Sequence, residues 1–307
     1  MYVALSAIKL VLAALVACYV ASLVFVIGGN LLSLWAARAR PMNTREAAAF
    51  GQVAPSPASR IGGIFAEAWY QTMTVRADLT RWVIGRPRLP SLDTGTPVLV
   101  LPGYLESTGS MVYLGRWLRS RGFRVVLEEF PSTFAPVADN SKFLLERIRE
   151  LRAQTGAPEI AVVAHSMGGV ITRNLIHTYP GDHGVKVLVC FASPHQGVSF
   201  AALAPGRSVQ DMRFDSEHNN ALSERVARAR ADVPIHAIVA VQEQVVTPPW
   251  AAMTEDGDTL VLPEALGHVG PLFARRAREQ AEVWLIQAGV ERAATEASTS
   301  SPPGPTD

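Results

Sequence analysis

The sequence predicts an α/β fold, a doubly wound and mostly parallel sheet, preceded by an N-terminal transmembrane helix. From Thr96 onward, short runs rich in Val, Leu and Ile alternate with segments whose apolar residues recur every three or four positions. This alternation is typical of βαβ units. The runs show no regular polar alternation, so we expect helices on both faces of the sheet. Ahead of them, no charged residue stands between Lys9 and Arg38.

The uncharged N-terminal segment is long enough to cross a bilayer. As a helix, its purest apolar stretch, 10–27, would cover roughly 27 Å, close to the thickness of the hydrocarbon core. The apolar character continues to Trp35, beyond the about 7–15 apolar residues of a cleavable signal peptide. We therefore expect an uncleaved, single-pass membrane anchor over residues 1–40.

A cysteine within this segment raises an alternative. Leu15-Val16-Ala17-Cys18 resembles the box at which bacterial lipoproteins are cut and acylated. Lipoproteins usually continue with a polar tether, whereas 19–27 is apolar, so lipidation is less favoured than a membrane span. A buried hairpin or core helix is the remaining alternative.

The charges that flank the span give a weak signal for its orientation. Arg38, Arg40 and Arg45 follow it, and Lys9 precedes it. Because Lys and Arg tend to stay on the cytoplasmic side, this bias favours a cytoplasmic domain. A secreted domain behind an uncleaved signal has a similar pattern, and the sequence leaves that alternative open.

Residues 41–94 are expected to form an amphipathic connector between the anchor and the sheet. Pro41 and a Pro55-Ser56-Pro57 break mark its first part. Apolar residues then follow at helical spacing, at Ile64, Phe65, Ala68, Trp69 and Met73. A helix here would pack on the domain or lie at the membrane surface.

The sheet domain is expected over residues 95–290. Its strands are predicted at Pro97–Leu101, Arg124–Leu127, Ile160–Ala164, Val185–Phe191, Ile235–Val241 and Thr259–Leu262. Its helices are predicted at Met111–Arg121, Ser141–Gln154, Met167–Tyr179 and Pro271–Gln287. Between Gly197 and Val233 we expect a packed loop and helix, with a small lid as the alternative. Residues 291–307 are expected to be a disordered tail.

Composition excludes several classes of protein. Hydrophobic residues make up 49% and charged residues 18%, which excludes a disordered chain. The 28 Lys+Arg and 27 Asp+Glu leave a net charge of +1, with no block of like charges, so we expect no nucleic-acid partner. Cys18 and Cys190 both lie in apolar runs, which excludes a disulfide scaffold and disfavours a cysteine metal site. The sequence implies no metal and no cofactor.

The strongest functional signal follows the predicted strand 160–164. It reads Ala164-His165-Ser166-Met167-Gly168-Gly169. A serine on a tight strand-to-helix turn, between small residues, is presented as a nucleophile. The N-terminus of the following helix stabilises anions, so the N–H of Met167 is a candidate oxyanion donor. A structural serine in a tight turn is the alternative interpretation.

An upstream strand ends in a second candidate element. The apolar strand that ends at Leu101 is followed by Pro102-Gly103-Tyr104. Gly103 permits a close backbone approach, and the N–H of Tyr104 could meet a substrate oxygen opposite Met167. Taken alone, the segment would be an ordinary turn after a strand.

A candidate base and acid follow in chain order. His268 stands in a loop after the last predicted strand and before the last predicted helix, and imidazole can exchange the serine proton near neutral pH. Glu243 is the first carboxylate after the strand 235–241 and could orient that imidazole. Asp256 and Asp258 are alternatives, although both are more readily interpreted as turn residues.

Taken together, these motifs resemble the α/β-hydrolase superfamily, in particular bacterial lipases and esterases whose nucleophile turn reads A-H-S-M-G-G. The resemblance covers about 96–287. Three further segments match in order. These are Ala192-Ser193-Pro194-His195-Gln196-Gly197, Glu243-Gln244-Val245-Val246 and Leu266-Gly267-His268-Val269-Gly270. Two departures stand out: Pro102-Gly103 replaces the usual His-Gly, and Glu243 replaces the usual Asp.

The resemblance implies a serine hydrolase that cleaves carboxylic esters through an acyl-enzyme, and the expected N-terminal span would anchor it to a membrane. Ser166, His268 and Glu243 would be its catalytic residues, Tyr104 and Met167 its oxyanion donors, and His195 a residue of the substrate pocket wall. A membrane anchor beside such a site favours a hydrophobic ester or lipid as substrate over a small soluble ester. A membrane acyltransferase with the same acyl-enzyme, or a non-catalytic scaffold with this fold, would be compatible with the same motifs.

Overall fold

The computed structural model describes residues 2–53, 55–87, 89, 94–199 and 204–293. Six strands form one sheet in the order β2-β1-β3-β4-β5-β6, with every neighbouring pair parallel. The strands are β1 (Pro97–Leu101), β2 (Arg124–Leu127), β3 (Ile160–His165), β4 (Val185–Phe191), β5 (Ile235–Ala240) and β6 (Thr259–Leu262). The predicted α/β fold and its strands are confirmed.

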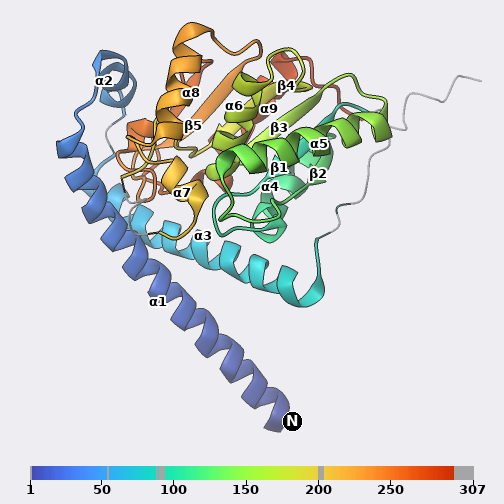
Figure 1. Ribbon diagram of the computed structural model, residues 1–307. Helices are drawn as coiled ribbons and strands as arrows, with labels where there is room; N and C mark the ends of the chain where they lie inside the picture. The colour runs from blue at the N-terminus through green and yellow to red at the C-terminus, as the bar shows by residue number, and fades with distance from the viewer. Residues whose placement is uncertain (1, 54, 88, 90–93, 200–203, 294–307) are drawn as a thin grey trace, which may run out of the picture.

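Both faces of the sheet are covered, as the uninterrupted apolar strands require. Successive residues of a strand point to opposite faces, so Leu99 and Val162 belong to one hydrophobic core and Val98 and Ala161 to the other. The first core is shared with α5 (Val137–Thr155) and α6 (Met167–Thr178). The second is shared with α4 (Thr108–Ser120) and α9 (Arg275–Gln287). Figure 1 shows these helices on either side of the strands.

The strand order reverses beside β1. The chain passes from β1 outward to β2, returns to β3 on the other side of β1, and then continues outward in order to β6. In open parallel sheets, ligands bind outside the carboxyl ends of the strands at such a switch point. The fold therefore places a candidate site where β1 and β3 end.

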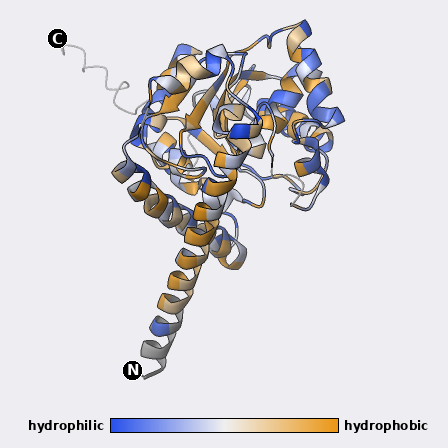
Figure 2. Cartoon of the chain, turned by 90° about the vertical axis from the view of Figure 1, so that its left-hand side faces the viewer, coloured by the Kyte–Doolittle hydropathy of each residue, from blue (hydrophilic) through white to orange (hydrophobic). Residues whose placement is uncertain are grey.

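Two long helices stand outside this sandwich. The helix α1 (Tyr2–Ala39) is the single helix in the described chain that is long and apolar enough to cross a membrane, over Leu12–Ala39. Figure 2 shows it as a mostly hydrophobic rod running away from the domain. After the short α2 (Thr44–Gly51), α3 (Pro57–Ile84) runs along the lower edge of the domain in Figure 1, where α1 crosses it.

The second half of α1 packs on the domain through one narrow stripe. Its buried residues are Ser22, Val26, Ser33 and Ala36, and a Cβ atom added at Gly29 would lie 2.7 Å from Cβ of Gln244. The steps of three and four residues place this stripe on one face of the helix. The remaining faces of α1 expose large apolar side chains.

The segment between β4 and β5 folds as packed helices. It contains α7 (Arg207–Asp211) and α8 (Glu217–Arg228). Val209 belongs to the core on the α6 face of the sheet, which fits the expected packed loop and helix rather than a separate lid. Residues 200–203 and nearly all of the predicted tail lie outside the described residues.

Candidate active site

Ser166 stands on a sharp turn between β3 and α6. Its φ of 50° and ψ of −120° are values that side-chain-bearing residues rarely adopt. The turn is fixed because the N–H of Ser166 donates to the carbonyl oxygen of Phe191 at 2.9 Å. The Ser166 side chain makes no capping hydrogen bond to α6. Its hydroxyl is therefore not occupied by the helix that follows it.

Two glycines bring the loop after β1 against this turn. A Cβ atom at Gly103 would lie 2.9 Å from Cβ of Ser166, and one at Gly168 would lie 2.7 Å from the carbonyl oxygen of Pro102. Contacts this short are not tolerated, so the close approach requires glycine at both positions. The loop after β1 is thereby held beside Ser166.

Two backbone donors are unused next to Ser166. In the described chain, no hydrogen bond uses the N–H of Tyr104 or of Met167. The N–H of Gly103, by contrast, donates to Glu106 Oε2 at 2.7 Å. The Tyr104 hydroxyl donates to the carbonyl oxygen of Pro205 at 2.6 Å. The two free N–H groups come from the two strands that meet at the switch point, and such pairs can stabilise an oxyanion.

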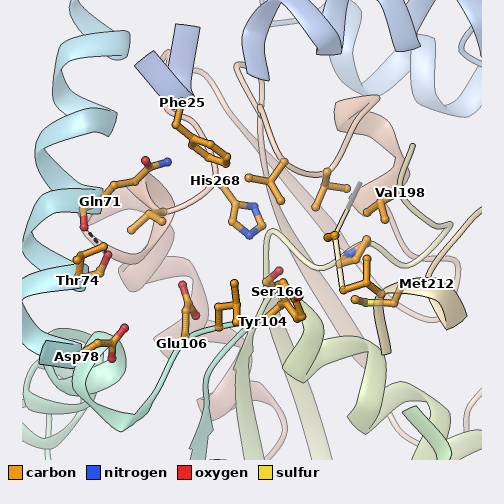
Figure 3. A pocket seen from close by; sticks show the side chains of 18 of the residues that line it. Phe25, Gln71, Thr74, Asp78, Tyr104, Glu106, Ser166, Val198, Met212 and His268 are labelled. Atoms are coloured by element: carbon orange, nitrogen blue, oxygen red, sulfur yellow. Dashed lines mark hydrogen bonds between the residues drawn. The ribbon is translucent and has the colours of Figure 1, made fainter. Parts of the chain in front are cut away.

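His268 and Glu243 are in direct contact. His268 Nδ1 lies 3.0 Å from Glu243 Oε2, while Glu243 Oε1 accepts the N–H groups of Val245 at 2.8 Å and Val246 at 3.1 Å. These bonds fix the carboxylate, which in turn fixes the imidazole with its proton on Nδ1. Among the described residues Nε2 makes no hydrogen bond, to Ser166 Oγ or to any other group. The imidazole and Ser166 line the same cavity (Figure 3).

The other two carboxylates considered for this role lie elsewhere. The side chain of Asp256 is buried, and its Oδ2 lies 3.0 Å from a guanidinium nitrogen of Arg173 and 3.2 Å from His177 Nε2. The Asp258 carboxylate lies beside His236, with 3.8 Å between Asp258 Oδ2 and His236 Nδ1. Of the three carboxylates considered from the sequence, Glu243 is therefore the one that reaches His268.

His195 does not line the cavity at Ser166, where the family resemblance implied it would lie. The cavity at Ser166 is lined by its neighbour Pro194, whereas the His195 ring lines a separate pocket with Arg40 and Arg173. Burial, with the nearby Arg173, lowers the pKa of His195 to about 3, so the ring is neutral. The expectation of a substrate-pocket residue at His195 is therefore corrected to its neighbour.

A residue that the sequence did not single out holds the histidine loop. Glu67 of α3 is 1% exposed, and its carboxylate accepts the N–H groups of Gly267 at 3.1 Å, Val269 at 2.7 Å and Gly270 at 2.8 Å. Gln244 links the two, since its amide donates to Glu67 and accepts the N–H of His268 at 3.0 Å. Thus α3 fixes the backbone on both sides of His268.

The two glycines of this loop are explained by the same carboxylate and by Gln244. A Cβ atom at Gly267 would clash with Gln244 Oε1 and would lie 2.7 Å from Cδ of Glu67, and one at Gly270 would lie 2.8 Å from Glu67 Oε2. The sequence signal that could have found Glu67 is the spacing of four between Gly63, Glu67 and Gln71, which places the three residues on one face of a helix.

A buried ion pair lies beneath the site. His165 Nδ1 is 2.7 Å from Glu106 Oε2, and His165 Nε2 is 3.1 Å from the carbonyl oxygen of His268. If Glu106 is ionised, both partners are acceptors, and the doubly protonated ring satisfies them with an N–H on each nitrogen. Burial opposes both charges, but each partner favours the charge of the other: the pKa of His165 is raised and that of Glu106 is lowered. This pair connects the loop after β1 with the histidine loop.

The cavity at Ser166 has a volume of about 420 Å³. Most of its wall is apolar and includes Val209, with Val198 and Met212 on one side. Its polar lining gathers around Ser166 and His268 and toward α3. Within the described residues, no cluster of three or more His, Cys, Asp or Glu side chains could hold a metal ion. The arrangement offers a hydroxyl, a base and two N–H donors at the end of an apolar cavity.

Comparison with known proteins agrees with this architecture. Residues 96–213 match a family described as "alpha/beta hydrolase fold". The strand order, the switch-point site and this match, which covers 96–213 of the 307 residues, show that the chain has the α/β-hydrolase fold. No curated protein sequence matches the chain.

Solved structures that share the fold include two lipases. Lipase B of Aspergillus fumigatus is similar with a TM-score of 0.56 and 19% identity, covering 64% of this chain and 54% of the lipase. The lipase BlEst2 of Bacillus licheniformis is similar with a TM-score of 0.52 and 13% identity, covering 66% of this chain and 96% of that one. The chain thus spans about half the length of the first lipase. At these identities the likeness concerns the fold.

Proposed function

We propose that this protein is a membrane-anchored serine hydrolase that cleaves hydrophobic carboxylic esters. The observation that carries the proposal is the contact of Glu243 with His268 at 3.0 Å, in a cavity that the imidazole shares with Ser166. The apolar wall of this cavity supports an ester with a hydrocarbon acyl group. The lipases that share the fold support the same substrate class.

The reaction follows from the roles of these groups. Ser166 Oγ attacks the ester carbonyl carbon while His268 Nε2 accepts its proton, and Glu243 stabilises the imidazolium through Nδ1–H. The N–H groups of Tyr104 and Met167 stabilise the oxyanion. His268 then protonates the departing alcohol, which leaves an acyl ester on Ser166. Water, deprotonated by His268, releases the acid and restores the serine.

The anchor is the second part of the proposal. The helix α1 has the length and composition of a span, and 11% of its most apolar window is buried. A soluble protein would cover such a surface. Two measurements on the mature protein test this: its mass and its extraction from membranes at alkaline pH. A protein that keeps its N-terminal segment and stays in the membrane supports an anchor. A chain cleaved after the apolar segment contradicts it.

The catalytic proposal is tested with the full chain in detergent. Ser166→Ala is expected to abolish hydrolysis of p-nitrophenyl butyrate and octanoate and labelling by a fluorophosphonate. Ser120→Ala, at the exposed end of α4, is the matched control and should keep both. Unchanged hydrolysis or labelling in Ser166→Ala would refute the nucleophile. Transfer of the acyl group to an added alcohol in place of water would indicate an acyltransferase.

A further inference from the structure

We propose that the active-site cavity opens into the bilayer, between α1 and α3, and that the substrate is an uncharged lipid ester taken laterally from one leaflet. This inference rests on the proposed function, because it requires both the esterase site and the membrane anchor. Three observations support it: the composition of the cavity rim, the depth of that rim along α1, and the exposed face of α3.

The rim of the cavity is built from the anchor itself. Phe25 of α1 lines the cavity together with Val75 of α3 and Leu105 of the loop after β1. These three side chains are also exposed, by 53%, 41% and 64%, so they lie at its mouth rather than at its floor. Figure 3 shows Phe25 on one side of the cavity and α3 beside it, with His268 and Ser166 further in.

The depth of Phe25 follows from the charges that flank the span. A helix crosses the hydrocarbon core with about 20 residues, and the uncharged segment lies between Lys9 and Arg38. Any window of about that length placed between the two charges contains Phe25. Even in the placement furthest from the domain, Phe25 stays about 6 Å inside the hydrocarbon boundary. The mouth of the cavity therefore lies at the depth of acyl chains.

The outer face of α3 continues this apolar surface. The helix α1 crosses it where Ser22 Oγ and Thr72 Oγ1 are 3.5 Å apart. On either side of the crossing, α3 exposes large apolar side chains, namely Ile61, Phe65, Trp69, Leu79, Trp82, Val83 and Ile84. Trp82 is 78% exposed. Apolar side chains with exposed tryptophans suit the boundary between lipid and water, and this face joins the span directly.

The charges at the mouth select the kind of lipid. Asp78 and Glu106 line the cavity, and no Lys or Arg among the described residues does so. Among the described residues, an anionic head group would meet the Asp78 carboxylate and the Glu106 carboxylate, which is paired with His165, and no Lys or Arg side chain. An uncharged lipid ester, such as an acylglycerol, meets no such repulsion and can place its acyl chain against the apolar wall.

The experiment compares one substrate in water with one in a bilayer. The full chain is reconstituted in phosphatidylcholine nanodiscs, and hydrolysis of p-nitrophenyl butyrate is measured beside that of a dioleoylglycerol held in the same disc. The variant Leu79→Glu/Trp82→Glu places two charges on the outer face of α3. Its matched control, Val283→Glu/Ile286→Glu, places two charges at the same spacing on exposed apolar residues of α9.

We expect Leu79→Glu/Trp82→Glu to lose about tenfold or more of the diacylglycerol activity, because charged side chains are expensive in lipid, and to keep the butyrate activity within about twofold. The control should keep both. Equal diacylglycerol activity in variant and wild type would overturn the inference. A wild-type dimer in the disc that dissociates in the variant would also overturn it, because the α3 face would then bind a second copy of the chain. Preferred hydrolysis of an anionic phospholipid ester would overturn the choice of lipid. Absence of butyrate hydrolysis in the wild type would instead refute the proposed function.

Discussion

Ser166 and His268 line the same cavity, but the chain holds them in different ways. Ser166 is fixed by the strand before it, the helix after it and one bond to the neighbouring β4. His268 depends on Glu243, on Gln244 and on Glu67, which stands 201 positions earlier in the chain. The nucleophile is thus positioned by local structure, and the base by contacts between distant segments. Remote substitutions should therefore disturb the base more than the nucleophile.

The largest expected effect is at the carboxylate that touches the base. Glu243→Gln keeps the size of the side chain but removes the charge that stabilises the imidazolium, so kcat should fall by about 10³- to 10⁴-fold with little change in KM. Steady-state hydrolysis of p-nitrophenyl octanoate measures both constants. Asp258→Asn is the control, since that carboxylate is exposed and lies beside His236. A loss in Asp258→Asn without one in Glu243→Gln would move the acid to the later loop.

The same contrast separates what could be predicted from the sequence and what could not. The strands β1, β2, β4 and β6 begin and end where the apolar runs do, because a strand covered on both faces has no polar positions to interrupt it. The turn at Ser166 was predictable because its small residues and its strained serine are neighbours in the chain.

The support of the histidine loop was not predictable in this way. Glu67 is one of two acidic residues, with Asp78, on a helix that exposes apolar side chains and buries small and polar ones, the reverse of a soluble amphipathic helix. Its partners, Gly267, Val269 and Gly270, become visible only once α3 is packed beside them. His195 was misplaced for a related reason, because the turn that contains it directs Pro194 to the cavity.

Glu67→Gln provides a direct test of this long-range support. Both oxygens of the Glu67 carboxylate accept backbone N–H groups. The amide of Gln has one oxygen and one NH₂ group, so the NH₂ donor would face some of these N–H groups. Displacement of the His268 backbone should lower kcat by about 10- to 100-fold while KM changes little. The rate of fluorophosphonate labelling should fall by the same factor, because it needs the base but not substrate binding.

The control for Glu67→Gln is Gln242→Ala, which removes another bond between α3 and the acid loop, the one from Gln242 to the carbonyl oxygen of Arg60 at 3.0 Å. It should leave kcat within about threefold. If the two variants behaved alike, Glu67 would be a general packing residue and not a positioning residue for His268.

The next largest effect is expected on the free energy of unfolding, when the His165–Glu106 pair is broken. The raised pKa of His165 contributes stability below its ordinary value of 6.5 and loses it as the pH rises through the raised value. The lowered pKa of Glu106 contributes stability above its ordinary value of 4.5 and loses it as the pH falls through the lowered value. Glu106→Gln should therefore destabilise the protein most between these two values, by about 3–5 kcal/mol for a broken buried pair.

Thermal unfolding at several pH values measures this effect. The difference in melting temperature between wild type and Glu106→Gln should be largest near pH 5 to 6 and shrink toward pH 9. Glu146→Gln breaks an exposed pair with Arg149 and should change the melting temperature by about 1 °C or less. A difference that does not depend on pH would mean that the buried pair carries no charge.

The smallest expected effect lies where α3 supports the other half of the site. Asp78 Oδ1 accepts the hydroxyl of Ser107 at 2.6 Å, the N–H of Ser107 at 3.2 Å and the N–H of Ser110 at 2.8 Å. Burial, together with the nearby Glu106, raises the pKa of Asp78 to about 6. Because the folded state holds this proton more tightly than the unfolded chain, stability falls as the pH rises from about 4 to about 6.

Asp78→Asn should remove this loss of stability at rising pH, because Asn does not ionise. It should keep the three hydrogen bonds, since all of them are accepted by the one oxygen that Asn retains. The variant should melt within about 1 °C of the wild type near pH 4 and roughly 2–4 °C above it near pH 7.5. Asp215→Asn, an exposed carboxylate beside Arg213, should show no such trend. If Asp78→Asn were instead less stable at pH 7.5, the charge of Asp78 would be needed to hold the start of α4. Support of the loop after β1 would then depend on α3 as strongly as support of His268 does.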